Sequence, residues 1–217
     1  MTRAPDLGLR PVEADLLFDL AAGAILAGVA GAETPQIDLA AMGPALLERR
    51  GVFVTIEVAG SLSGCIGTVE PVEPVAVAVP RLAREAAFND PRFPPVTSDD
   101  WPDLAIKISL LDPLVPVPAA DEADLVSRIR IGVDGLVLAT GGHRATFLPS
   151  MWQRLAEPRR FVRHLQQKAG VPPGSWPAGT RAWTYTALEL SRPASAAIDR
   201  RAASSVTTSS DGVSRRS

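Results

Sequence analysis

Alternating apolar and other residues predict a β-hairpin between residues 52 and 68. Val52, Val54, Ile56 and Val58 are separated by single intervening residues, which is the period-2 pattern of a strand with one buried face. The following Ala-Gly-Ser sequence at residues 59–61 can turn the chain, so residues 62–68 return as a second strand. The chain's one cysteine, Cys65, falls within this second strand.

The same alternation predicts three further β segments. Residues 104–110 read as a strand that stops at Asp112-Pro113. Residues 135–139 and 144–147 read as a second hairpin around Gly141-Gly142-His143, and residues 182–190 read as one last strand. Residues 116–121 read as a linker.

Helical patterns lie between these strands. We predict helices over residues 12–30, 44–50, 122–130 and 150–169, the last of them restarted at Pro158. Residues 74–89 are ambiguous, because alternating valines precede a helical run at residues 82–88. We favour a helix there, although Pro80 would kink it anywhere beyond its first turn.

The order of helices and hairpins predicts an α+β fold with antiparallel β-sheets and flanking helices. Residues 192–217 lack aromatic residues and are rich in Ser, Ala and Arg. We therefore predict one folded domain over residues 1–191 and a disordered tail over residues 192–217. The tail holds five arginines and two aspartates, a net charge of +3, whereas the whole chain carries −2.

Composition narrows the function classes. The net charge of −2 argues against a strongly nucleic-acid-binding domain, and no apolar run approaches the roughly 18 residues of a membrane span. One cysteine cannot form an internal disulfide, and the first residues lack the basic and apolar regions of a signal peptide. We therefore predict a cytoplasmic protein without membrane association.

A series of ordered motifs resembles the AMMECR domain family, also called AmmeMemoRadiSam system protein A. The motifs are Arg50-Gly51-Val52-Phe53-Val54-Thr55, Leu62-Ser63-Gly64-Cys65-Ile66-Gly67-Thr68, Ala86-Ala87-Phe88-Asn89-Asp90-Pro91-Arg92-Phe93-Pro94-Pro95, Ile108-Ser109-Leu110-Leu111, Ile131-Gly132-Val133-Asp134-Gly135-Leu136, Phe147-Leu148-Pro149 and Lys168-Ala169-Gly170. The resemblance covers about residues 12–190. It implies two lobes, the larger built from both chain ends and the smaller from the central residues. It also implies association, in genomes, with a Memo-like protein and a radical S-adenosylmethionine (SAM) protein, which are possible partners. It implies no settled reaction.

One residue departs from the family pattern. The family's hexapeptide usually has arginine where this chain has Ser63. An arginine beside Cys65 would favour its thiolate or hold an anion, and serine does neither electrostatically. Either that arginine is dispensable, or Arg92 or another cation replaces it, or this chain has lost an activity.

Cys65 is the first candidate catalytic residue, because a thiol between two glycines allows close approach of a ligand or of backbone. His143 and His164 are the two histidines, and His143 is the candidate base. The alternative is that Cys65 is simply a small buried apolar residue. Ser63, Gly64 and Gly67 are candidate substrate contacts.

Asp90 and Arg92 lie in a loop that holds three prolines. Asp90 is a second candidate proton acceptor, and Arg92 is a candidate clamp for a carboxylate or phosphate. The alternative is a structural salt bridge that locks the loop.

No other pattern predicts a bound group. The cysteine and the histidines match no metal-ligand spacing, and the glycine pairs do not open helices after strands, so we predict no metal and no cofactor. Basic residues at 154, 159, 160, 163 and 168 favour a solvated helix face over a nucleic-acid patch.

Two functions therefore remain almost equal. One is an accessory modification enzyme whose cleft around Cys65 takes an unknown small or macromolecular substrate. The other is a binding or adaptor module without catalysis. Nucleic-acid binding ranks third.

Overall fold

The computed structural model describes residues 8–196. The chain divides into two compact units, one holding residues 8–110 and 189–196 and the other holding residues 111–188. The first unit is thus formed by segments from both sides of the second. Residues 197–217, most of the predicted tail, lie outside the described residues.

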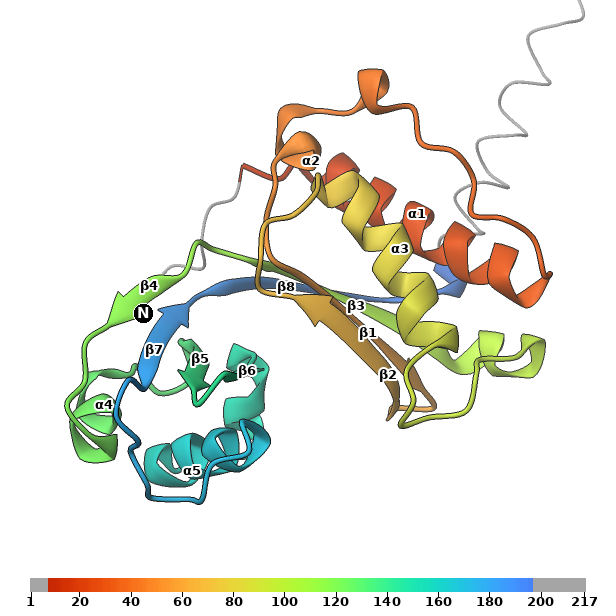
Figure 1. Cartoon of the computed structure of the whole chain (residues 1–217). Helices are drawn as coiled ribbons and strands as arrows, with labels where there is room; N and C mark the ends of the chain where they lie inside the picture. Colours follow the sequence, from red (N-terminus) through yellow and green to blue (C-terminus); the bar gives the residue numbers. More distant parts are fainter. Residues whose placement is uncertain (1–7, 197–217) are drawn as a thin grey trace, which may run out of the picture. The chain divides into compact units, whose positions relative to one another are not determined.

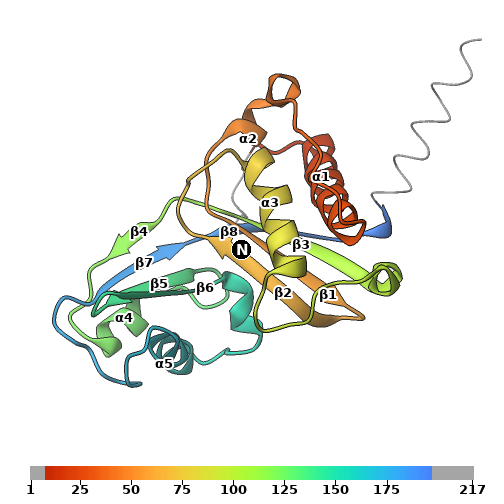
Figure 2. The same ribbon diagram turned by 45° about the vertical axis from the view of Figure 1, so that its right-hand side comes forward.

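The first unit is a four-stranded antiparallel sheet with helices packed on it. The strands β1 (Val52–Val58), β2 (Ser61–Thr68), β3 (Leu104–Leu111) and β8 (Ala187–Pro193) have the order β2-β1-β3-β8. The helices α1 (Pro11–Val29) and α3 (Val75–Phe88) lie side by side over one face of the sheet, and the short α2 (Pro44–Leu47) lies near the start of α3 (Figures 1 and 2). The predicted hairpin over residues 52–68 is confirmed as β1 and β2.

Cross-strand rows of apolar side chains form the core beneath these helices. Val54 of β1 pairs with Ile66 on one side and Ile108 on the other, and Val54 and Ile108 are fully buried. Residues directly opposite one another on antiparallel strands share a face, so this row points toward α1 and α3. The alternate row, with Thr55 at its centre, therefore points to the opposite face.

The ambiguous segment at residues 74–89 is a helix, as favoured, and Pro80 lies in its interior. Proline in a helix interior leaves the carbonyl four residues earlier without its N–H donor. The ring of Pro80 is buried, and burial of its apolar surface offsets that loss.

The second unit has its own sheet with the order β4-β7-β5-β6. Its strands are β4 (Val115–Val117), β5 (Gly135–Thr140), β6 (His143–Phe147) and β7 (Arg181–Tyr185). The helices α4 (Glu122–Arg128) and α5 (Pro158–Lys168) enclose a core that includes Leu136, Leu138 and Phe161. β4 overlaps the start of the segment, residues 116–121, that was predicted to be only a linker.

Short 3₁₀ helices complete the two units. They are η1 (Leu39–Ala41) and η2 (Ser98–Asp103) in the first unit and η3 (Pro149–Gln153) in the second. The helix predicted over residues 150–169 is thus η3 followed by α5, and the restart at Pro158 is confirmed.

The last predicted strand, over residues 182–190, is wrong as a single element. The chain breaks at Thr186, so that β7 belongs to one sheet and β8 to the other. Asp112 fixes this break, because its N–H donates to the Thr186 carbonyl at 2.9 Å and its carboxylate accepts from the Thr186 hydroxyl. The α+β class with antiparallel sheets is confirmed. No helix among residues 8–196 is long and apolar enough to cross a membrane.

Candidate functional site

Cys65 lies near the middle of β2 on the sheet face opposite α1 and α3. Its cross-strand partner is Thr55 of β1, and Thr55 in turn pairs with Lys107 of β3. The Thr55 hydroxyl donates a hydrogen bond to the Cys65 Sγ at 3.2 Å, and the thiol is half-buried. A thiol, a hydroxyl and an ammonium group therefore follow one another across three strands.

The two glycines beside the thiol are required by packing. A Cβ atom at Gly64 would lie 1.9 Å from the backbone oxygen of Ala86 in α3, and one at Gly67 would lie 2.3 Å from the Phe53 ring. Either contact is far inside van der Waals distance. The close approach that these glycines predicted is therefore made by the protein itself, to backbone at Gly64 and to an aromatic ring at Gly67.

Ser63 is the extra residue of a β-bulge. The register of β1 with β2 shifts between Ile56, which pairs with Gly64, and Glu57, which pairs with Leu62. The skipped residue is Ser63, half-buried at the position where the family usually has arginine. A bulge twists its strand and redirects the neighbouring side chains, and bulges are frequent beside functional sites.

Asp90 and Arg92 bind the loop after α3 to the backbone of Cys65. The Asp90 side chain is 1% exposed and accepts from the Cys65 N–H at 2.9 Å. Arg92 donates to both carboxylate oxygens, from Nε at 2.8 Å and from Nη2 at 2.6 Å, and Nη2 also donates to the Cys65 carbonyl at 2.9 Å. This paired geometry is the strongest form of Arg–carboxylate contact. Both backbone groups of Cys65 are thus held by one ion pair.

The ion pair shifts the pKa values of both Asp90 and Arg92, so that both side chains stay charged. The side-chain hydrogen bonds from Arg92 hold the pKa of Asp90 well below its ordinary value, and the N–H groups of Cys65 and Arg92 add to this effect while burial opposes it. The bond to Asp90 is the main cause of the raised pKa of Arg92, and the charge of the Cys65 thiolate contributes last. A carboxylate held so firmly in its ionised form is a weak base, so the geometry favours the structural salt bridge over proton transfer by Asp90.

A family model described as AMMECR1 matches residues 18–190. The chain belongs to the AMMECR1 family.

Relatives and a solved structure agree with this assignment. A protein of Methanothermobacter thermautotrophicus is 44% identical over 129 residues, which is 58% of this chain and 66%, just under two thirds, of the relative. A protein of Methanocaldococcus jannaschii is 34% identical over 144 residues, covering 64% of this chain and 72% of the relative. The crystal structure of an uncharacterised protein from Pyrococcus horikoshii is similar with a TM-score of 0.76 and 28% identity, covering 82% of this chain and 91% of that one.

The two histidines of this AMMECR1 family member lie in the unit that does not contain Cys65. His143 is exposed and opens β6 directly after the Gly141-Gly142 turn. His164 is exposed on α5, where its Nδ1 lies 2.8 Å from the carbonyl oxygen of Arg160. The structure brings together Cys65, Asp90, Arg92 and the residues beside Cys65, and it places His143 elsewhere in the chain.

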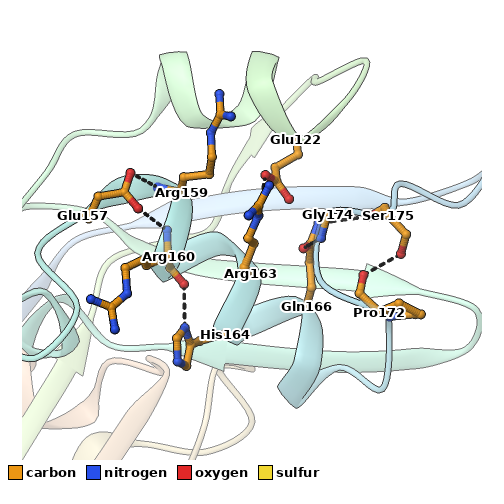
Figure 3. A network of polar contacts seen from close by, with 10 residues as sticks. All are labelled: Glu122, Glu157, Arg159, Arg160, Arg163, His164, Gln166, Pro172, Gly174 and Ser175. Carbon is orange, nitrogen blue, oxygen red and sulfur yellow. Dashed lines mark hydrogen bonds and ion pairs between the residues drawn. The ribbon is translucent and has the colours of Figure 1, made fainter.

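Several basic residues of α5 form hydrogen bonds within their own unit, through side chains or through backbone N–H groups. Arg163 donates through Nε to Glu122 of α4 at 3.0 Å, and the N–H groups of Arg159 and Arg160 are capped by Glu157 (Figure 3). Lys168 donates to the Thr146 carbonyl at 3.0 Å. These contacts tie α5 to its own unit. Among residues 8–196, no group of three or more His, Cys, Asp or Glu side chains is placed to hold a metal ion.

The sequence reasoning missed three residues on the Cys65 face. Thr55 contacts the thiol, and Lys107 pairs with Glu57 at 2.6 Å on the same face. The information was available in the hairpin register, because strands joined by the turn at residues 59–60 place Thr55 opposite Cys65 once the bulge is counted. We name the set Thr55, Cys65, Lys107 and Glu57 the thiol face.

Proposed function

We propose that this AMMECR1 family member is an accessory factor that acts with a Memo-like protein and a radical SAM protein, and that the thiol face is its recognition surface. The observation that carries the proposal is that the hydrogen bonds of the Asp90 carboxylate are taken up by the protein itself. Its two oxygens accept from Arg92 and from the Cys65 N–H, so the nearest acid to the thiol serves to hold β2 in place.

The chemistry of the face suits recognition. It presents a hydroxyl, a thiol and an ammonium–carboxylate pair from adjacent strands, all half-buried. Partly exposed polar groups on a rigid sheet contribute specificity to a protein contact, because a partner must match their positions. The thiol fills a place where a small side chain fits beside Thr55.

A second candidate is that Cys65 is the nucleophile of an accessory modification enzyme. Two observations favour it. The Thr55 hydroxyl donates to the half-buried Sγ, and the Arg92 guanidinium donates to the carbonyl of the same residue at 2.9 Å. The proton acceptor that this reaction needs is then outside the Cys65–Asp90–Arg92 group, with His143 the candidate that the sequence offers.

Association with the proposed partners tests the recognition surface. The full chain and its variants are co-expressed with a Memo-like protein and a radical SAM protein from the same source, and the amount co-purified is measured. We expect C65S to associate like wild type, because serine keeps the size and the hydrogen bond to Thr55. We expect K107E to lose association at least tenfold, because it reverses a charge on the thiol face.

Arg159→Glu is the matched control, because it reverses an exposed charge in the other unit. Circular dichroism checks that each variant folds. Full association by K107E, or equal losses in K107E and R159E, would contradict the surface. Loss in C65S alone would favour the nucleophile.

A further inference from the structure

The second unit contains a groove that neither the thiol face nor the proposed function uses. It has a volume of 710 Å³ and opens where β4 separates from β7. Its walls come from residues 116–120 and 180–183, and two side chains of α4 complete it. Ligand pockets for small molecules have volumes of about 300–1,000 Å³, so the groove has the size of a small-molecule site.

The groove exists because the β4–β7 ladder is short. β4 is three residues long, and its pairing with β7 ends at Val117 opposite Ala182. The next residue, Pro118, has no N–H to continue the ladder, so the chain turns away and leaves a space beside Arg181. The walls of that space are mainly apolar, from Pro116, Val117 and Ala182.

The charges in the groove leave a positive excess. Asp124 is neutralised within α4, because it accepts from Arg128 Nε at 2.7 Å and also from the Ala120 N–H at 3.0 Å. Arg181 is exposed and forms no ion pair with any residue between 8 and 196. Its guanidinium carbon lies 5.3 Å from the centroid of the Trp183 ring. The mainly apolar groove is therefore lined by one guanidinium group that has no carboxylate partner among the described residues.

A second guanidinium contacts the same indole. The guanidinium carbon of Arg144 on β6 lies 5.5 Å from the Trp183 ring centroid. Arg144 and Arg181 both pair with Ala139 of β5, from its two sides, so they share a face of the sheet with Trp183. Indole rings stack on flat aromatic rings, and guanidinium groups bind phosphate oxygens.

We propose that this groove binds a small anion that carries a planar ring, of the chemical class of a nucleoside phosphate. The ring stacks on Trp183, and the phosphate is held by Arg181. The apolar wall at Pro116 and Val117 excludes water from one edge of the ring. The proposal does not depend on the thiol face, because every residue it uses lies between 116 and 183.

Adenosine monophosphate, adenosine and inorganic phosphate are the probes, each titrated by calorimetry into the full chain. We expect adenosine monophosphate to bind more tightly than either of the other two. Arg181→Gln is expected to weaken its binding at least tenfold, and Trp183→Leu is expected to weaken adenosine monophosphate and adenosine alike. Arg159→Gln, an exposed arginine on α5, is expected to leave binding unchanged.

Arg181 is exposed, so R181Q keeps the test valid even where W183L lowers stability. Absence of adenosine monophosphate binding, or unchanged binding by R181Q, would overturn the site. Equal binding of phosphate and adenosine monophosphate would overturn the role of the ring. Equal binding of adenosine and adenosine monophosphate would overturn the role of the anion.

Discussion

The carboxylate of Asp90 has almost no contact with solvent, and its position depends on charge as well as shape. It accepts hydrogen bonds from the backbone N–H, the Nε and the Nη2 of Arg92 and from the Cys65 N–H, so each carboxylate oxygen already accepts two. The Asp90 side chain is 1% exposed, whereas the Arg92 side chain is 55% exposed. Loss of their hydrogen bonds would therefore cost more free energy at Asp90, because water can replace the partner of Arg92 only. The pair therefore holds β2 through its buried member.

Asp90→Asn should destabilise the protein and flatten its acid response. At pH 7 we expect the free energy of unfolding to fall by about 2 kcal/mol or more. The NH2 group of asparagine would face the N–H donors that the carboxylate now accepts from, and the buried ion pair would be lost. The lowered pKa of Asp90 stabilises the fold above the unfolded value of about 4, and this contribution is lost as pH falls from about 5 toward the folded pKa.

Urea unfolding at pH 7 and pH 3.5 measures both effects. Wild type should lose more stability between the two pH values than D90N does. Glu33→Gln, at an exposed acid between α1 and η1, is the control and should leave the difference close to wild type. An equally steep acid loss in D90N would show that Asp90 is not the titrating group.

At the scale of elements, regular strands could be predicted and local irregularities could not. The alternation of Val52, Val54 and Ile56 fixed both the hairpin and the face that meets the helices. The break at Thr186 has no glycine or proline beside it. The bulge at Ser63 precedes Gly64, but Gly67 lies in the same strand without a bulge, so a glycine alone does not locate the irregularity. The break depends on Asp112, which is distant in sequence.

The hairpin turn gives a prediction at this scale. Ala59 and Gly60 have φ values of 48° and 75°, so both turn residues are left-handed, as in the two-residue turns that best fit strand twist. Alanine is strained in this region by about 1–2 kcal/mol. Ala59→Gly should therefore stabilise the protein by about 0.5–1 kcal/mol in chemical denaturation.

Ala105→Gly is the matched control, because Ala105 lies within β3 and has no left-handed strain. It should destabilise the protein by about 0.5–1 kcal/mol, since glycine weakens a strand interior. The strain argument fails if both substitutions change stability in the same direction.

For the whole molecule, the candidate site was only partly predictable. The sequence motifs pointed to Cys65, Asp90 and Arg92, and the fold brings these three together through hydrogen bonds. Whether these residues can transfer a proton depends on tertiary contacts that a sequence pattern does not contain. The main such contact is the pair of hydrogen bonds from Arg92 to both Asp90 oxygens. His143 was grouped with them because it is one of two histidines, and its place in the other unit depends on topology.

The alkylation rate of Cys65 is the most direct test of the central claim that this residue belongs to a recognition surface. Cys65 is the chain's one cysteine, so iodoacetamide uptake at pH 7, followed by mass spectrometry, reports on it alone. We expect the native protein to react no faster than the urea-unfolded chain, because the half-buried Sγ is less accessible to the reagent than it is in the unfolded chain. A native rate well above the unfolded rate would contradict this account and identify Cys65 as an activated nucleophile.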